Sequence, residues 1–309
     1  MPTRRNDYGI NTEFERDTLR IGEIILGDGS RQLVTAVTGP GGVVRISDPV
    51  IEQEIVRLGG AEPYEHYFCH CFAGNHWSGD SRLHDGAAGN HFVPGANLPL
   101  ASLWGTPGVA STLTPVTGAL NSVLRAPALN YDYMGGEKLI LWWYGQCAPH
   151  ASLDRSFLGD GNSTSIPGVR IRCKVNGKFD VSMADATVAR FSAEHPNVVF
   201  DGTPHSLAFA IDGTTKTYAM WADEVLYSTA EPNYMNFVGK QAVDPRTTAT
   251  FNVGSARPDG HTDGIAVQTR ALAIMRLPAT ATMPTTTALT ALFTQMRAAP
   301  HKLIRKGAL

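Results

Sequence analysis

The sequence contains few charged residues: Asp, Glu, Lys and Arg make up only 17% of its 309 residues, and the formal net charge is −2. Without an excess of positive charge, the chain has no bulk attraction to nucleic acid or to an anionic membrane. It also lacks an apolar run close to the roughly 20 residues of a membrane-spanning helix. Residues 1–20 are charged and have no apolar stretch typical of a secretion signal. We therefore expect no nucleic-acid partner, no membrane insertion and no export by that route.

Cysteine is also scarce, and four residues are too few for a disulfide scaffold at this length. Two of them, Cys69 and Cys71, flank His70 in a histidine-rich stretch. Zinc sites commonly use a C-x₂₋₄-C spacing, so the C-x-C spacing favours buried free thiols beside surface histidines, with zinc as the alternative. The remaining histidines of this stretch are His66, His76, His84 and His91, and the remaining cysteines, on separate predicted strands, are Cys147 and Cys173.

Motifs for catalysis are missing as well. The chain has no G-x-S-x-G turn, no phosphate-binding loop and no H-E-x-x-H pair. A retaining glycosidase needs two carboxyl groups about 5–5.5 Å apart. Glu52 and Glu54 are the nearest match, and alternation along a strand places Asp223 and Glu224 on opposite faces. We therefore expect no enzymatic activity, with glycoside hydrolysis kept as the least favoured alternative.

What the chain does contain is a long β pattern. Between about residues 119 and 277, short apolar runs alternate with turn residues at regular spacing, which predicts a sandwich or barrel. Asn176-Gly177 suits a type I′ hairpin turn. After Pro284, Leu289, Leu292, Phe293 and Met296 form one apolar helical stripe. The expected strands cover residues 65–72, 137–147, 168–175, 178–183, 205–212, 216–228, 249–255 and 265–277.

This sequence pattern predicts that the chain has three parts. Residues 1–60 form an N-terminal arm with an anchoring β segment, because residues 1–20 are polar and irregular and residues 21–58 hold short apolar runs broken by glycine turns, which predict two or three strands. Residues 61–283 form the sandwich. Residues 284–309 form a short amphipathic helix followed by a basic tail.

The order of strands and turns carries a resemblance. The segments are "EKLILWWYG", with Trp142 or Trp143 in an aromatic position, the hairpin "VRIRCKVNGKFDVSM", then "DGTPHSLAFAIDG" and a closing "FNVGSARPDGHTDGIAVQTRALAIMRL". This set resembles laminin G-like domains of the concanavalin A-like lectin/glucanase superfamily over residues 62–280. Pro204 stands where that family usually has Trp. The resemblance implies an all-β, two-sheet antiparallel jelly-roll sandwich, here with an N-terminal extended or β segment and a short C-terminal helix.

The resemblance also suggests where ligands would bind. Laminin G-like domains often hold calcium at the sandwich rim, and glycine-rich loops supply oxygen ligands here, although Asp and Asn are also ordinary turn residues. We therefore expect no cofactor, with calcium as the alternative. Exposed aromatic rings would stack on a saccharide, although core packing is the commoner role of such rings. The calcium candidates are Asp160, Asn162, Asp259 and Asp263, and the saccharide candidates are Trp221, Tyr227 and Trp104.

His205 is the most conspicuous polar residue within the β pattern. It lies between two Asp-Gly pairs and begins a strand in which Leu207, Phe209 and Ile211 alternate with small residues. The Asp-Gly pairs are turns about ten residues apart, so we do not expect Asp201 and Asp212 to meet at His205. His205 is therefore predicted to be structural, as are Trp142 and Trp143.

An arm, a lectin-like sandwich and a short helix, with little charge and no catalytic motif, resemble bacteriophage structural proteins. The prediction is a non-enzymatic virion protein, such as a capsid decoration protein, head fibre or tail appendage, made in the host cytoplasm. Its arm would anchor it to other virion proteins, and exposed strand edges favour a homo-oligomer. The alternative is a carbohydrate-binding module for a host surface polysaccharide.

Overall fold

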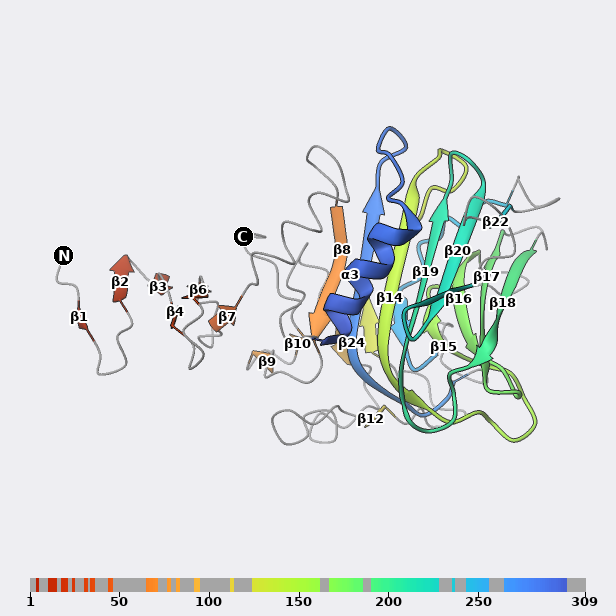
Figure 1. Cartoon of the computed structure of the whole chain (residues 1–309), viewed down its shortest axis with the longest axis horizontal. Coiled ribbons are helices and arrows are strands. Elements are labelled where there is room, and N and C mark those ends of the chain that lie inside the picture. The colour runs from red at the N-terminus through yellow and green to blue at the C-terminus, as the bar shows by residue number, and fades with distance from the viewer. Residues whose placement is uncertain are drawn as a thin grey trace.

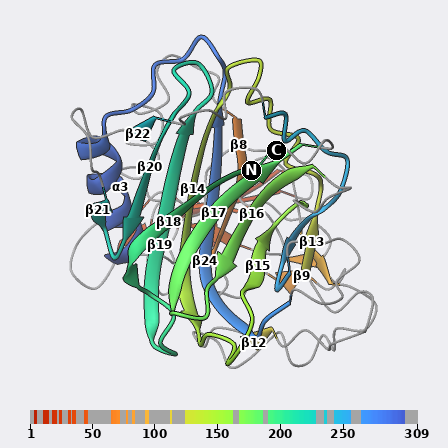
Figure 2. The same ribbon diagram turned by 90° about the vertical axis from the view of Figure 1, so that its right-hand side faces the viewer.

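A computed structural model shows a β-sandwich of two antiparallel sheets with one helix packed outside it (Figure 1). It describes residues 124–161, 167–185, 190–227, 243–255 and 264–298, with Phe92, β22 and a set of strands nearer the N-terminus. Figure 2 shows three layers, with α3 at the left, then the sheet that holds β19 and β20, then the sheet that holds β15, β16 and β17. The predicted all-β sandwich with a C-terminal helix is confirmed.

Among the strands that the structure describes, seven form one sheet in the order β11-β13-β23-β15-β16-β17-β18. These strands are β11 (Val93–Pro94), β13 (Leu124–Ala126), β15 (Arg155–Gly159), β16 (Gly168–Cys173), β17 (Lys178–Ala184), β18 (Arg190–Val198) and β23 (Phe251–Val253).

The other sheet follows the order β12-β24-β14-β19-β20-β21, and β8 pairs with β24 while β22 pairs with β20. Its strands are β8 (Glu65–Cys71), β12 (Thr112–Leu113), β14 (Lys138–Cys147), β19 (Pro204–Asp212), β20 (Thr217–Ala222), β21 (Val225–Tyr227), β22 (Met235–Asn236) and β24 (Val267–Leu277). Neighbouring strands β8, β24, β14, β19 and β20 run side by side across Figure 1.

The space between the two sheets holds the main hydrophobic core, which we call the inner layer. Alternation along β19 turns Leu207, Phe209 and Ile211 into it, as the sequence predicted. Trp143 of β14 lies there with Phe157 of the opposite sheet, and the ring centroids are 5.1 Å apart. The bulky side chains of each strand therefore bind the two sheets together.

The outer face of the eight-stranded sheet forms a second apolar cluster, the outer layer. Small residues of β19, Ala208 and Ala210, leave room for helix α3 (Thr286–Ala298) to lie close to the sheet. The helix buries Leu289, Leu292, Phe293 and Met296 against this face, which confirms the stripe predicted from the sequence.

A β-bulge interrupts the pairing of β24 with β14. Tyr144 pairs with Ala271, but the next residue of β14 pairs with Thr269, so Arg270 is the extra residue. Val267 points into the inner layer on one side of this bulge, and Leu272 does so on the other. A bulge of this kind changes the direction in which a side chain points. Arg270 is thereby brought to the outer face beside Tyr144.

Two hairpin turns differ from the sequence prediction. At Asn176-Gly177 only the glycine has a positive φ, 75°, whereas a type I′ turn needs positive φ at both central residues. That signature occurs instead at Asp223 (φ 49°) and Glu224 (φ 62°), between β20 and β21. The expected strand 216–228 is therefore a hairpin, and these two carboxylates do not alternate across a strand.

Short strands also occur in the N-terminal part. They include pairs within residues 24–46, where strands were expected, and pairs within residues 4–21, most of which were expected to be irregular. The domain boundaries at 60 and 283 stay predictions. Among the described residues, no helix is long and apolar enough to span a membrane. The short strands of the N-terminal part are β1 (Arg4–Arg5), β2 (Asn11–Glu15), β3 (Thr18–Ile21), β4 (Ile24–Ile25), β5 (Arg31–Gln32), β6 (Val34–Ala36), β7 (Val44–Ile46), β9 (Trp77–Ser78) and β10 (Arg82–Leu83).

Candidate functional site

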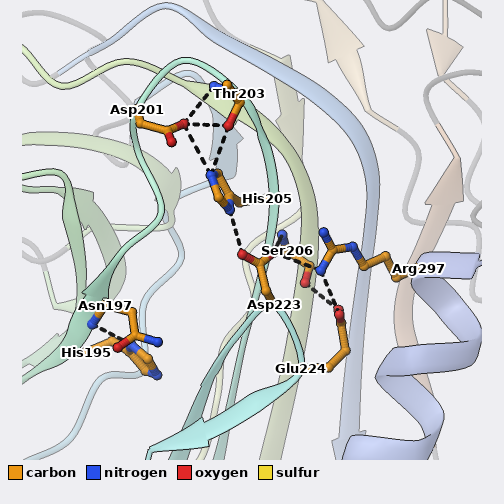
Figure 3. Close-up of polar contacts among 9 residues, drawn as sticks. All are labelled: His195, Asn197, Asp201, Thr203, His205, Ser206, Asp223, Glu224 and Arg297. Carbon is orange, nitrogen blue, oxygen red and sulfur yellow. Dashed lines mark hydrogen bonds and ion pairs between the residues drawn. The ribbon is translucent and has the colours of Figure 1, made fainter.

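A polar network gathers at the turn between β20 and β21 (Figure 3). Asp223 stands at its centre. One carboxylate oxygen accepts the amide N–H of Ser206 at 3.0 Å and lies 2.9 Å from the guanidinium of Arg297. The other oxygen lies 2.6 Å from Nδ1 of His205. These contacts hold a non-glycine residue at positive φ, a conformation that needs support from its surroundings.

His205 lies between two carboxylates. Its Nδ1 faces Asp223, and its Nε2 lies 3.2 Å from Asp201 and 3.0 Å from the hydroxyl of Thr203. The prediction that Asp201 and Asp212 do not meet at His205 is confirmed, but Asp201 alone does reach it, because residues 201–203 form a tight turn that folds Asp201 back over the start of β19. Asp212 indeed lies elsewhere, as an ion pair with Lys138 (Nζ to Oδ1 3.7 Å).

The series Thr203, His205 and Asp223 has the order of a nucleophile, a base and an orienting acid. Its surroundings argue for a structural role instead. The Thr203 hydroxyl donates to Asp201 at 2.7 Å, and this hydroxyl and the Thr203 amide hold the pKa of Asp201 below its usual value. A negative charge at that position disfavours an oxyanion. The amides of Gly202 and Thr203 already donate to Cys147 and Asp201, so they are not available to stabilise one.

The same network ties the end of α3 to the sheet. Arg297 in the last helical turn donates to Glu224 at 2.7 Å as well as to Asp223. The Ser206 hydroxyl donates to the other oxygen of Glu224. A cation in the last turn also interacts favourably with the helix dipole. The hairpin turn and the helix end are thus joined by two ion pairs.

An aromatic residue adjoins this network on the outer face. The ring centroid of Tyr144 lies 5.6 Å from the guanidinium carbon of Arg270 and 5.9 Å from that of Arg297. Tyr144, Arg270 and Arg297 are all half-buried, so each still reaches solvent. We call these three residues the Tyr144 patch. None of the three was among the candidate residues predicted from the sequence. The signal in the sequence was the interval of five residues between the apolar Val267 and Leu272, because regular alternation along a strand needs an even interval.

His195 of β18 lies on the other side of the same hairpin (Figure 3). Its ring stacks on Phe179 with centroids 5.2 Å apart and meets the edge of Tyr227 at 5.5 Å. The amide of Asn197 donates to its Nδ1 at 3.1 Å. Burial lowers the pKa of His195 to about 4, so the ring is neutral at pH 7. His195 of the seven-stranded sheet thus contacts Tyr227 of the eight-stranded sheet at one edge of the sandwich.

The predicted saccharide-binding aromatics are not brought together. Trp221 is only 1% exposed, because Phe293 of α3 meets its ring at 5.1 Å and its Nε1 donates to Thr290 at 2.9 Å. With its ring covered by the helix, Trp221 offers no face for stacking on a sugar. Tyr227 is half-buried against His195, and Trp104 lies outside the described residues. Trp142 and Trp143, expected to be structural, are both fully buried.

One of the four calcium candidates lies among the described residues. Asp160 is buried, and its two oxygens accept the amide N–H groups of Val169 (2.8 Å) and Leu129 (3.2 Å). Burial raises the pKa of Asp160 to about 7, against the opposite effect of these amides. Its side chain therefore ties β16 to the segment before β14. Asn162, Asp259 and Asp263 lie outside the described residues, and calcium binding stays a prediction.

Other candidates fall in parts whose side chains the structure does not describe. Glu52 and Glu54 lie there, as do Cys69, Cys71 and the histidines near them, although residues 65–71 do form the expected strand, β8. Cys147 and Cys173 are buried free thiols, as predicted.

No family model matches the chain, and no curated protein matches it. Among solved structures, it is similar to the binding domain of botulinum neurotoxin serotype D, with a TM-score of 0.43, 7% identity and coverage of 60% of this chain and 42% of that one. It is also similar to the Ruminococcus gnavus IT-sialidase CBM40 bound to α2,3 sialyllactose, with a TM-score of 0.40, 11% identity and coverage of 60% and 100%. The chain spans less than half the length of the neurotoxin domain. The ligand named for the sialidase module is a property of that protein.

Proposed function

We propose that this chain is a non-enzymatic saccharide-binding protein that recognises its ligand at the Tyr144 patch. The observation that carries the proposal is a half-buried aromatic ring on the outer face of a rigid sheet, beside arginine and carboxylate groups. An aromatic ring supplies an apolar surface with a polar tip, and a few placed polar groups give orientation and specificity.

The polar network around His205 supports a binding role over a catalytic one. Its carboxylates are engaged with partners of the same chain: Asp223 with His205 and Arg297, and Glu224 with Ser206 and Arg297. A general acid or base has to exchange a proton with a substrate in a plausible pose. Groups that brace a turn and a helix end instead make a firm support for a neighbouring binding surface.

Glycan-array binding of the purified chain tests this function. We expect binding to at least one bacterial surface polysaccharide, and we expect Tyr144→Ala to abolish it. Tyr227→Ala is the matched control, since Tyr227 is also a half-buried tyrosine of the same sheet but contacts His195. Both variants should unfold in one thermal transition. If no saccharide binds, or if Tyr144→Ala binds as the unaltered chain does, the proposal is wrong.

The virion role predicted from the sequence belongs to the same proposal: residues 1–60 anchor the chain, as a homo-oligomer, to other virion proteins, and the sandwich presents the saccharide site. Support comes from the resemblance and from the low charge of the chain. Deletion of residues 1–60 should abolish incorporation into particles while saccharide binding survives. Incorporation of the truncated chain would contradict the anchoring role.

A further inference from the structure

We infer that the saccharide bound at the Tyr144 patch is acidic, and that Arg270 binds its carboxylate. This inference rests on the proposed function and narrows it to one class of ligand. Three properties of Arg270 lead to it: its place on a bulge, the absence of an anionic partner among the described residues, and its position over an aromatic ring.

The bulge places Arg270 where regular pairing would not. In a regular strand, residues alternate between faces, yet Arg270 and Ala271 are consecutive and both belong to the outer face. The neighbouring Thr269 points inward, where its hydroxyl accepts the Nε1–H of Trp143 at 3.0 Å. The bulge thus adds a single residue between the pairs of β24 with β14, and that residue is Arg270.

Arg270 has no anion to neutralise it within the part of the chain that the structure describes. Its Nε is shielded from solvent and has no hydrogen-bond partner, and its described contact is with the ring of Tyr144. A partly buried guanidinium in this state is costly, and a bound anion is one way to satisfy it. Arg276, at the other end of β24, also has a buried Nε with no partner among the described residues, but it differs in having an anion, because Glu137 accepts from its Nη2 at 2.6 and 2.8 Å.

Arg297 plays a different role from Arg270 in this site. Its positive charge is offset by Asp223 and Glu224, and Asp201 and His205 lie beyond them in the same network. The acidic groups on this side would repel an anion, so the carboxylate of a ligand belongs on the Arg270 side of Tyr144. A guanidinium fork matches a carboxylate with two parallel hydrogen bonds. The sugar ring then lies against Tyr144, and the ligand is an acidic sugar with one carboxylate per bound unit.

The probe is an oligogalacturonate, and the matched neutral probe is its fully methyl-esterified form. Binding of both to the full chain is measured by titration calorimetry at low and at moderate salt. We expect the acidic form to bind at least about 10-fold more tightly than the ester, and Arg270→Gln to remove that difference. Arg270→Lys should keep part of it, since it keeps the charge but loses the fork. Arg246→Gln, at an exposed arginine paired with Asp244, is the control and should bind as the unaltered chain does.

Each outcome decides the inference. Equal binding of the acid and the ester, with a loss in Tyr144→Ala, would keep the saccharide function and overturn the acidic selectivity. A preference for the acid that survives in Arg270→Gln would overturn the role of Arg270. Binding of a single-stranded oligonucleotide that depends on Arg270, without binding of either saccharide, would overturn both the proposed function and this inference. Thermal unfolding of Arg270→Gln near that of the unaltered chain confirms that the variant is folded.

Discussion

Two consecutive tryptophans of β14 belong to different layers of the molecule. Trp143 lies in the inner layer with Phe157 and Phe200, and its Nε1 donates to Thr269. Trp142 lies in the outer layer, where it stacks on Tyr144 with centroids 6.2 Å apart. Both are fully buried, yet the Nε1 of Trp142 has no hydrogen-bond partner among the residues that the structure describes. Of these two indole N–H groups, the one in the inner layer is thus paired, and the one in the outer layer has no partner within the described part of the chain.

The difference between the two layers follows from what covers each face of the eight-stranded sheet, where the inner face borders the inner layer and the outer face borders the outer layer. Seven strands cover the inner face, and each is fixed by its neighbours through backbone hydrogen bonds. Among the described residues, one 13-residue helix covers the outer face. A helix of this length is marginal alone in water and depends on packing. We therefore expect the inner layer to set the global stability and the outer layer to open locally.

Replacement of the two tryptophans gives the largest expected effect. Trp143→Ala should lower the free energy of unfolding by about 4 kcal/mol, because a cavity between two fixed sheets does not collapse. Trp142→Ala should cost about 3 kcal/mol, since the helix is able to settle and an unpaired N–H is removed. Urea unfolding followed by circular dichroism measures both. An equal or larger loss in Trp142→Ala would contradict the assignment of stability to the inner layer.

Phe293→Ala tests whether the outer layer opens on its own. Phe293 meets Trp221 edge to face and is fully buried under the helix, so its loss should cost up to about 3 kcal/mol. We expect hydrogen exchange to show faster exchange in α3 while the amides of β14 and β19 stay protected. Ala291→Ser, on the exposed side of α3, is the control. Equal loss of protection in helix and sheet would mean that the two layers unfold together.

Much of this layering was predictable. The alternation of Leu207, Phe209 and Ile211 with alanines predicted which residues of β19 face each layer. The spacing of Leu289 and Phe293 predicted the buried stripe of α3. Those patterns depend only on the period of each element. The hairpin at Asp223 and Glu224 was not predictable in this way, because its positive φ values are stabilised by contacts with Ser206 and Arg297, which are distant in sequence.

The candidate site depended on the same kind of distant contact. Trp221 was selected as an aromatic residue, but only the packing of α3 shows that its ring is covered. Tyr144 and Arg270 were not selected because strand pairing and a bulge bring them together across 126 positions of sequence. Such a bulge depends on pairing with a neighbouring strand, so local pattern does not reveal it.

Acidification should destabilise the edge of the inner layer. Burial holds the pKa of His195 at about 4, below the roughly 6.5 of an unfolded chain. The folded state then binds fewer protons, so the stability from His195 is fully present above pH 6.5 and is lost as the pH falls towards 4. We expect His195→Phe to reduce the loss over this range by about 3 kcal/mol. Urea unfolding at a series of pH values measures it. A slope in His195→Phe equal to that of the unaltered chain would contradict the assignment.

The smallest effect expected is at the one described hydrogen bond between α3 and a tryptophan of the outer layer. The Thr290 hydroxyl accepts the Nε1–H of Trp221 and donates to the carbonyl of Thr286, so Thr290→Val leaves a buried donor unpaired without changing the size of the side chain. The expected loss is about 1 kcal/mol, together with faster exchange in α3 alone. Thr294→Val is the matched control, because the exposed Thr294 hydroxyl donates only to the carbonyl of Thr290. Equal effects of the two substitutions would show that the bond to Trp221 adds nothing, and that apolar packing alone holds the helix on the outer layer.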